Sequence, residues 1–327
     1  MLRRFIPDPF LLVLIGTVLL ATVLPASGRG AEAVSWAATA AIVLLFFLHG
    51  AKLPREAVVA GIRHWRLHLA ILASTFLVFP LVGLVAARAL PGIMPAPLWT
   101  GVLFLAALPS TVQSSIAFTS LAGGNVPAAI ASASASQIAG IFLTPLIVGL
   151  LASAHGGGVE LGSIGGILLQ LLLPFVAGHL LRPWIAGWVE RNRRYLGYSD
   201  RSAILLSVYS AFSAAVIEGI WQRLPLPVLA VLMVVCAAIL AVMLAITQAG
   251  TRALGFSRED RIAAVFCGTK KSIVSGIPMA RVLFSGPDVG LILLPIMIFH
   301  QMQLMACAWL ARRWADAAET RKEQGAP

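Results

Sequence analysis

Polar and helix-breaking residues interrupt one apolar run of the sequence near its middle. The interruption reads Leu108-Pro109-Ser110-Thr111-Val112-Gln113-Ser114-Ser115. Pro109 has no backbone donor and crowds the carbonyl four residues earlier, so we expect a helix to break there and to free backbone groups. Free carbonyls beside neutral side-chain oxygens suit a hard cation such as Na⁺, or the polar head of a solute. Those oxygens belong to Thr111, Gln113, Ser114 and Ser115. The alternative is a proline kink whose hydroxyls bond back to their own helix.

A second apolar run is interrupted by two adjacent lysines, within Cys267-Gly268-Thr269-Lys270-Lys271-Ser272. A lysine at the bilayer centre costs at least about 2.5 kcal/mol even on insertion scales. Adjacent helical residues point about 100° apart, so both lysines avoid lipid only where the helix is broken or enclosed. Three roles are open to Lys270 and Lys271. They bind an anionic substrate, they release protons because burial disfavours the charged form, or one stands where a cation would otherwise bind. The alternative is that both reach an interface from a misplaced span.

Two further apolar runs carry polar residues that could join such a site. Ser132 and Ser136 share one helical face, and Gln137 lies beside it. Small residues also permit close helix packing, so a packing role is an equal alternative. In the last run, His300 lies in a polar patch with Gln301 and Gln303. His300 could relay protons, and a hydrogen-bonded structural histidine is the alternative reading.

Composition and length make the runs that carry these residues membrane spans. Of the 327 residues, 59% are hydrophobic and 11% are charged, against about 25% charged in ordinary globular proteins. These values exclude a disordered chain, a coiled coil and most soluble enzymes, and they predict an all-α polytopic membrane protein. The sequence predicts ten spans, at 8–26, 33–53, 67–90, 97–122, 125–152, 160–182, 201–220, 226–250, 261–284 and 288–312. Breakers such as Gly28-Arg29-Gly30 separate them.

The basic residues predict how these spans are oriented. The net charge is +11, and 18 of the 24 lysines and arginines fall at the termini and in one set of alternate loops, against three in the opposite set. Because positive charge marks the cytoplasmic side, both termini are expected in the cytoplasm of a multi-pass inner (plasma) membrane protein. The first run follows Arg3 and Arg4 and is expected to be retained as a helix. A cleaved secretory signal is the alternative.

Ten spans divide into two sets of five, and an odd number makes the second set enter the membrane from the opposite side. We therefore predict one transmembrane transporter domain, 1–327, built as an inverted repeat of 8–152 and 160–312 with a cytoplasmic tail at 313–327. The fourth and ninth spans then correspond, and both are interrupted. Matched interruptions predict a substrate or ion site at mid-membrane.

Several other function classes are not supported by the sequence. No basic stripe is interleaved with aromatic residues, so nucleic acid is not an expected partner. Cys236, Cys267 and Cys307 form neither a CxxC pair nor a cysteine–histidine cluster, which argues against a disulfide framework and a zinc site. No HExxH motif, paired intramembrane aspartates or GxSxG with a plausible histidine partner is present, so the protein is not expected to be an enzyme.

These segments resemble the bile acid:sodium symporter family, in particular its bacterial members related to solute carrier family 10 and the YfeH-type branch. The resemblance covers nearly the whole chain. Its most specific parts are Leu108–Ser115, Leu121-Ala-Gly-Gly-Asn125 with Thr144-Pro145, and Arg258–Ser272. The resemblance implies ten helices in two inverted repeats, with unwound fourth and ninth helices that cross. It also implies a core of spans three to five and eight to ten, which moves against a panel.

In sodium-coupled members of that family the crossing point binds two sodium ions. By the motif match, Ser115 takes the place of a polar ligand, and Thr75 lies where a third-helix Gln is found. Phe266 falls where the shared ligand Glu is expected, and Lys270 where a Gln is expected. Ile116 falls where an Asn is usual. The acidic ligand is lost and two positive charges arrive, which argues against the same pair of sodium sites and against bile acid as substrate.

Taken together, these features predict a secondary active transporter that moves an organic, anionic solute by alternating access. The expected partners are a small organic solute and the lipid bilayer, and the oligomeric state is not predicted. No cofactor is expected beyond a coupling ion, Na⁺ or H⁺. The expected substrate and ion ligands are Thr75, Thr111, Gln113, Ser114, Ser115, Ser136, Gln137, Thr269, Lys270, Lys271, Ser272 and His300, with Na⁺ at Ser115, Ser136 and Gln137. The alternatives are a sodium-independent or proton-coupled transporter, and a channel or regulatory protein of the same fold.

Overall fold

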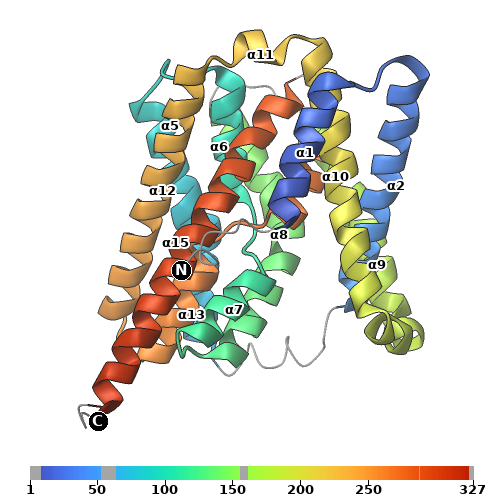
Figure 1. Ribbon diagram of the computed structural model, residues 1–327. Helices are drawn as coiled ribbons and strands as arrows, with labels where there is room; N and C mark the ends of the chain where they lie inside the picture. The colour runs from blue at the N-terminus through green and yellow to red at the C-terminus, as the bar shows by residue number, and fades with distance from the viewer. Residues whose placement is uncertain (1–8, 53–63, 155–160, 287, 324–327) are drawn as a thin grey trace. The chain divides into compact units, whose positions relative to one another are not determined.

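The computed structural model describes residues 9–52, 64–154, 161–286 and 288–323, and these residues fold into helices without a strand (Figure 1). The described helices fall on the ten predicted ranges. Six of the described helices are individually long and apolar enough to cross a bilayer: Gly28–Lys52, Trp65–Ala89, Val126–Leu151, Tyr195–Ile217, Leu226–Ala253 and Val289–Ala318. The predicted all-α polytopic architecture is therefore confirmed. The twofold relation between the halves stays a prediction.

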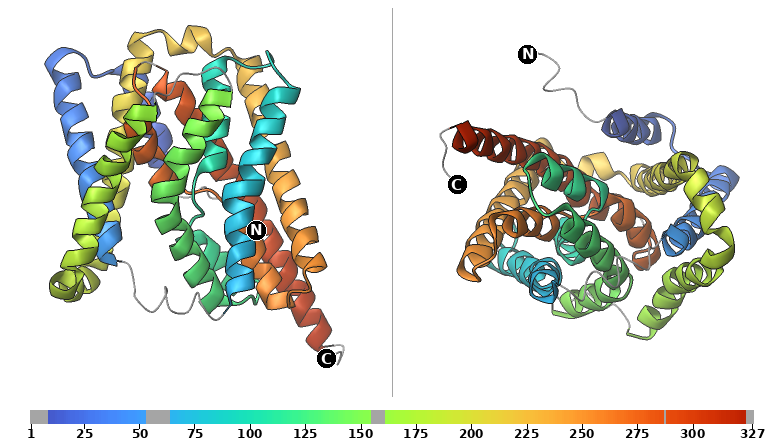
Figure 2. Two further views of the ribbon diagram at one scale, coloured as in Figure 1. Left: turned by 180° about the vertical axis from the view of Figure 1, so that it is seen from behind. Right: turned by 90° about the horizontal axis from the view of Figure 1, so that it is seen from below.

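The chain divides into two compact units. Unit 1 comprises residues 1–53, 165–229 and 277–294, as far as they are described. Its complete helices are α1 (Pro9–Val23), α2 (Gly28–Lys52), α10 (Arg193–Ile217) and the short α11 (Ile220–Arg223). Most of α9 (Leu161–Arg191) also belongs to it. Helix α10 packs against both α1 and α2, and α2, α9 and α10 lie side by side in each view (Figures 1 and 2).

Two glycines bring the backbones of α2 and α9 into direct contact. A Cβ atom added at Gly50 would lie 1.9 Å from the carbonyl oxygen of Phe175, and one added at Gly178 would lie 1.9 Å from the carbonyl oxygen of Phe47. The contact is reciprocal, so each glycine makes room for the backbone of the other helix. Close backbone approach through small residues is the usual way in which helices associate in lipid.

Unit 2 comprises residues 54–164, 230–276 and 295–327, as far as they are described. It contains α4 (Trp65–Ala73), the π-helix η2 (Ser74–Val78) and α5 (Phe79–Ala89), which follow one another without a gap. It also contains α6 (Ala96–Ala107), α7 (Gln113–Leu121), α8 (Val126–Ala154) and α13 (Arg258–Gly268). Most of α12 (Leu226–Ala253) and of α15 (Val289–Glu323) belongs to it, with the first turn of α14 (Ile273–Leu283). Unit 2 thus holds most of the residues in the spans that the resemblance assigns to the core, while 277–294 belong to unit 1.

Three helix boundaries differ from the sequence-based expectations. Gly28-Arg29-Gly30 was expected to separate spans, but α2 begins at Gly28, whose φ of +51° is a conformation that glycine adopts readily. The loop expected between 182 and 201 is helical except at Asn192, because α9 and α10 extend with polar residues beyond the apolar stretch. Helix α15 likewise continues to Glu323, so most of the expected tail is the last part of a helix.

Candidate functional site

The fourth span (α6 and α7) and the ninth span (α13 and α14), here called the fourth and ninth segments, are both broken in the middle. The two breaks meet inside unit 2. The fourth segment is non-helical between Ala107 and Gln113, and the ninth between Gly268 and Ile273. The backbone N–H of Ser272 donates to the carbonyl oxygen of Pro109 at 2.9 Å, which joins the two breaks directly. Figures 1 and 2 show α6 and α7 separated by an extended stretch. The prediction of two matched interruptions that meet is therefore confirmed.

The break at Pro109 leaves five consecutive carbonyl groups without helical donors, and each of them has another donor. The Lys271 ammonium donates to Ala106 and Leu108, and the Thr144 hydroxyl donates to Ala107. The remaining two receive Ser272 N–H, at Pro109, and Gln137 Nε2, at Ser110. Unpaired backbone groups are too costly to leave inside a membrane protein. Side chains of α8 and donors from the break of the ninth segment therefore hold this break as a fixed structure.

A second proline frees a carbonyl in the third segment, which comprises α4, η2 and α5. Pro80 has no N–H, and the π-helix just before it directs the N–H of Phe79 to the carbonyl of Ser74. The carbonyl of Thr75 consequently has no donor in its own helix, and it accepts from the Lys271 ammonium at 2.8 Å. Single π-turns inside α-helices are frequent at functional sites. The hydroxyl of Thr75, which was the predicted ligand, instead donates to Ile71 in its own helix.

Lys271 is fully buried and has a complete set of partners. Its Nζ lies 2.8 Å from the carbonyl oxygen of Thr75, 2.7 Å from that of Ala106 and 2.8 Å from that of Leu108. The ring centroid of Phe79 lies 4.1 Å from the same nitrogen. The backbone of Lys271 is held on both sides by Gln303, whose Oε1 accepts from the N–H and whose Nε2 donates to the carbonyl, each at 2.8 Å.

Lys270 is equally buried but has no hydrogen-bond partner among the described residues. Its Nζ lies 4.3 Å from the ring centroid of Phe118 on α7. The Phe118 ring lies against Phe266, and Phe266 lies against Trp314 of α15. A cation over an aromatic face is attracted by about 2 kcal/mol or more when desolvated, far less than the cost of burying an isolated charge. Among the described residues, no hydrogen-bond partner compensates the charge of Lys270. Lys270 is therefore the uncompensated cation of the crossover, the place where the two breaks meet.

The hydroxyl groups of the fourth segment form a small cluster at the start of α7. Ser114 donates to Thr111 at 3.0 Å, and the Thr111 and Ser115 oxygens lie 2.9 Å apart. Ser115 also donates to the carbonyl of Phe266 at 2.8 Å, which links α7 to α13. Gln113 is exposed, and the Thr269 hydroxyl bonds back to Val265 in its own helix.

Gln137 bridges the two breaks from α8. Its Nε2 donates to the carbonyl of Ser110 at 2.6 Å, and its Oε1 accepts from the hydroxyl of Ser275. Ser136 accepts from the N–H of Ser110 at 3.0 Å. The structure thus brings both Ser136 and Gln137 to the backbone of Ser110, whereas Ser115 contacts Thr111 and Phe266. Ser272, the remaining predicted ligand of the break, contacts Ser275 through its side chain.

Sequence reasoning missed two residues that complete the crossover. Gln303 was noticed in the polar patch with His300 but was not placed in the site, although it holds both backbone groups of Lys271. His300 contacts Gln303 at 2.9 Å. A glutamine one helical turn from a histidine in a membrane span was the available signal. Ser275, the partner of Gln137, carried no signal of its own.

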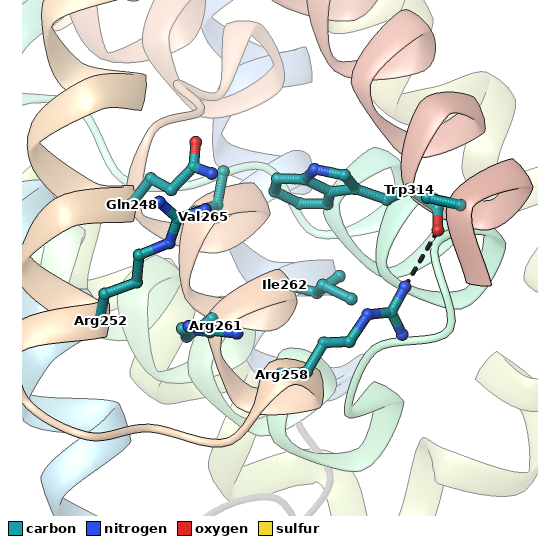
Figure 3. Close-up of a pocket in the computed structure, with 8 residues that line it drawn as sticks. Gln248, Arg252, Arg258, Arg261, Ile262, Val265 and Trp314 are labelled. Carbon is teal, nitrogen blue, oxygen red and sulfur yellow. Dashed lines mark hydrogen bonds between the residues drawn. The ribbon is translucent and has the colours of Figure 1, made fainter. Parts of the chain in front are cut away.

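A separate basic cluster lines a cavity of about 150 Å³ among α12, α13 and α15. Its arginines are Arg252, Arg258 and Arg261, and Figure 3 shows Arg258 directed toward α15, where it donates to the carbonyl of Trp314 at 3.0 Å. The lining contains none of the residues predicted for the substrate or ion site. These arginines are partly or fully exposed, so water solvates their charges. Lys270 and Lys271, by contrast, are fully buried.

Comparison with known proteins identifies the class of protein to which this chain belongs. The chain is 58% identical over 313 residues to a Pseudomonas aeruginosa protein named "Uncharacterized protein PA2026", covering 95% of this chain and 94% of that one. It is 51% identical over 317 residues to the Escherichia coli "Putative symporter YfeH", covering 97% and 96%. It is 28% identical over 270 residues to rat "Sodium/bile acid cotransporter 7", covering 81% and 79%.

These relatives confirm the resemblance to the bile acid:sodium symporter family and its YfeH-type branch. The apolar helices and the bacterial relatives support a multi-pass inner-membrane protein with transporter relatives. A sequence profile of transporters matches residues 8–316, which is nearly the whole chain. The chain therefore belongs to the SBF-like CPA transporter family.

Proposed function

We propose that this protein is a secondary active transporter for an organic anion, and that the anionic group binds at Lys270. The observation that carries the proposal is the fully buried Lys270 ammonium, which has no hydrogen-bond partner among the described residues. A carboxylate, sulfonate or phosphate group would supply the missing charge and hydrogen bonds. Charge-assisted hydrogen bonds are about twice as strong as neutral ones, and they gain further in a low dielectric.

The surroundings of Lys270 suit the rest of such a solute. The aromatic ring of Phe118 offers an apolar surface within contact of the ammonium. Ser114 and Ser115 lie one helical turn before Phe118 on α7, and both have hydroxyl groups in the polar cluster at the break. A site of this kind combines an apolar wall with a few placed polar groups, as binding sites for small organic molecules usually do.

Alternating access is the transport mechanism that this arrangement supports. Lys270 and the two breaks belong to unit 2, so the binding groups would travel together when the two units move relative to each other. The distribution of basic residues supports cytoplasmic termini. A monovalent cation, Na⁺ or H⁺, is the proposed coupling ion, because unwound segments of this type carry such ions in secondary transporters.

The test is a stabilisation screen on the purified protein, followed by flux measurement. Thermal unfolding is followed with carboxylates, sulfonates and organic phosphates, with and without Na⁺ and across pH. At least one class should raise the melting temperature of the wild type and of Arg313→Gln, which removes an exposed charge elsewhere. The same anion should leave Lys270→Met unchanged. An anion that stabilises Lys270→Met as strongly as the wild type would remove Lys270 from the site.

Flux in proteoliposomes then distinguishes the transporter from a channel of the same fold. The stabilising anion, radiolabelled, should show saturable uptake and counterflow, and Lys270→Ala should abolish both. Ohmic currents without counterflow would instead identify a channel. Dependence of the uptake on a Na⁺ gradient or on a pH gradient reports which ion is coupled.

A further inference from the structure

We propose that the carbonyl groups of Thr75, Ala106 and Leu108 form a monovalent-cation site whose resident cation is the ammonium of Lys271. On this reading, Lys271 occupies a position that a free Na⁺ would otherwise take, and that position does not exchange ions with solution. This cation site is distinct from the ammonium of Lys270, at which the anion is proposed to bind. Its consequence for coupling rests on the proposed transport function, but the existence of the site does not.

The three carbonyls have the construction of an ion site. Each lacks a helical donor, because the π-helix before Pro80 redirects the N–H of Phe79 away from Thr75, and because α6 ends just before Pro109 in the case of Ala106 and Leu108. They come from two different segments, and they converge on one point 2.7 to 2.8 Å away. Carbonyl oxygens freed by unwound or broken helices are the groups with which membrane proteins replace the hydration shell of a cation.

The geometry also identifies the occupant as a charged ammonium. An ammonium group has three N–H donors and meets three acceptors here, whereas a neutral amine has only two donors. The face of the Phe79 ring, 4.1 Å from Nζ, closes a further side with negative π density. Among the described residues neither lysine forms an ion pair, so carbonyl dipoles and the ring supply the compensation for Lys271.

The occupant of the site, Lys271, is held in place as well. Gln303 bonds both backbone groups of Lys271, so the start of the lysine side chain is held in place. A cation bound in this way cannot leave during a transport cycle. If transport occurs as proposed, this position contributes no Na⁺ to the coupling stoichiometry.

A purely structural lysine would satisfy the same three carbonyls, and a rescue experiment separates the two readings. Lys271→Ala keeps the three carbonyls and leaves an empty cavity where the lysine side chain was. Its thermal unfolding is followed in ethylammonium, n-propylammonium, Na⁺ and tetramethylammonium chloride, with propionamide as a neutral donor. The primary alkylammonium ions and Na⁺ should raise the melting temperature by several degrees in a saturable way. Tetramethylammonium, which has no N–H, and propionamide should not.

Two controls make the rescue specific. The wild type and Lys271→Met should not respond to the alkylammonium ions, because a tethered ammonium or an apolar chain already fills the cavity. Equal responses in Lys271→Ala and Lys271→Met, or rescue by propionamide as large as that by ethylammonium, would overturn the cation site.

A wild-type measurement covers the case in which Lys271→Ala does not fold. The melting temperature of the wild type is compared in sodium chloride and choline chloride of equal concentration, and any stabilisation by sodium should persist in Lys271→Gln, because a coupling Na⁺ would bind at another position. Stabilisation by sodium that disappears in Lys271→Gln would contradict the inference, because Na⁺ would then be using this position beside the lysine. None of these measurements requires transport, so their failure is distinguishable from failure of anion binding at Lys270.

Discussion

The break between α13 and α14 has two sides, and each side receives one lysine. On the side of the third and fourth segments, Lys271 meets three backbone carbonyls and an aromatic face. On the side of α7, Lys270 meets an aromatic face without a hydrogen-bond partner among the described residues. Both side chains are fully buried, and they are neighbours in sequence.

The difference shows that burial alone does not define what a membrane lysine does. Lys271 compensates the backbone at the crossover, and removing its charge would leave three buried acceptors unpaired. Lys270 adds a charge that the described residues do not compensate, so its removal would relieve the fold. The first lysine is thus expected to matter for stability and the second for ligand binding.

The strongest test of this contrast is Lys271→Met. The substitution keeps the volume of the chain but leaves three buried carbonyls without donors, each costing about 1 to 3 kcal/mol. We expect the free energy of unfolding to fall by about 3 kcal/mol or more, measured by unfolding of the purified protein in detergent. A loss no larger than that of Lys270→Met would contradict the assignment of roles.

Gln303→Leu tests whether the backbone of Lys271 must be held. The change removes two buried hydrogen bonds to the backbone of Lys271 and one contact with His300, and should lower the free energy of unfolding by about 2 kcal/mol or more, measured in the same way. Gln301→Leu is the matched control on the same helix, because Oε1 of Gln301 is buried without a hydrogen-bond partner among the described residues. Equal losses in the two variants would mean that Gln303 acts only by packing.

Gly140→Ala tests the packing around the proline of the fourth segment. A Cβ added at Gly140 would lie 2.7 Å from a ring carbon of Pro109, which cannot bend away. We expect a loss of about 1 to 2 kcal/mol through overpacking. Gly250→Ala, with open space around the added atom, is the control and should be neutral or slightly stabilising. A neutral Gly140→Ala would show that the break can shift freely.

Lys270→Met should have the opposite sign from Lys271→Met. Removing an uncompensated buried charge should leave the melting temperature unchanged or raise it. The stabilisation that organic anions give the wild type should vanish at the same time. A marked fall in the melting temperature would show that Lys270 has a partner in the fold.

Arg252→Gln should have the smallest effect on stability. Its side chain is exposed at the arginine-lined cavity, so water solvates the charge in the folded and unfolded states alike. The free energy of unfolding should change by less than about 0.5 kcal/mol. A larger change would mean that this basic cluster, too, is compensated from within the fold.

Much of the site could be predicted because its causes are local. Pro109 removes a backbone donor and crowds the preceding turn in a stretch rich in polar residues, and two central lysines require an enclosure whatever surrounds them. The breaks in the structure accordingly fall at the predicted places. The same reasoning identified Gln137 as costly to bury alone, and it bonds both breaks.

The rest could not be predicted because it depends on what lies opposite each residue. Nothing in the sequence separates Lys270 from Lys271, since their difference arises from the third segment on one side and α7 on the other. Thr75 was chosen for its hydroxyl, but the π-helix before Pro80 makes its carbonyl the interacting group. Gln303 is indistinguishable from Gln301 until the register of α15 is known.

The glycine contact between α2 and α9 has a consequence for biogenesis. Gly50 and Gly178 are separated by 128 positions in the chain, and the spans of unit 2 that come third to fifth are synthesised between them. At ordinary translation rates α2 would wait on the order of ten seconds for its partner. During that interval its glycine face must be shielded by lipid or by the insertion machinery, which makes early association of α2 with a wrong helix the hazard that this fold has to avoid.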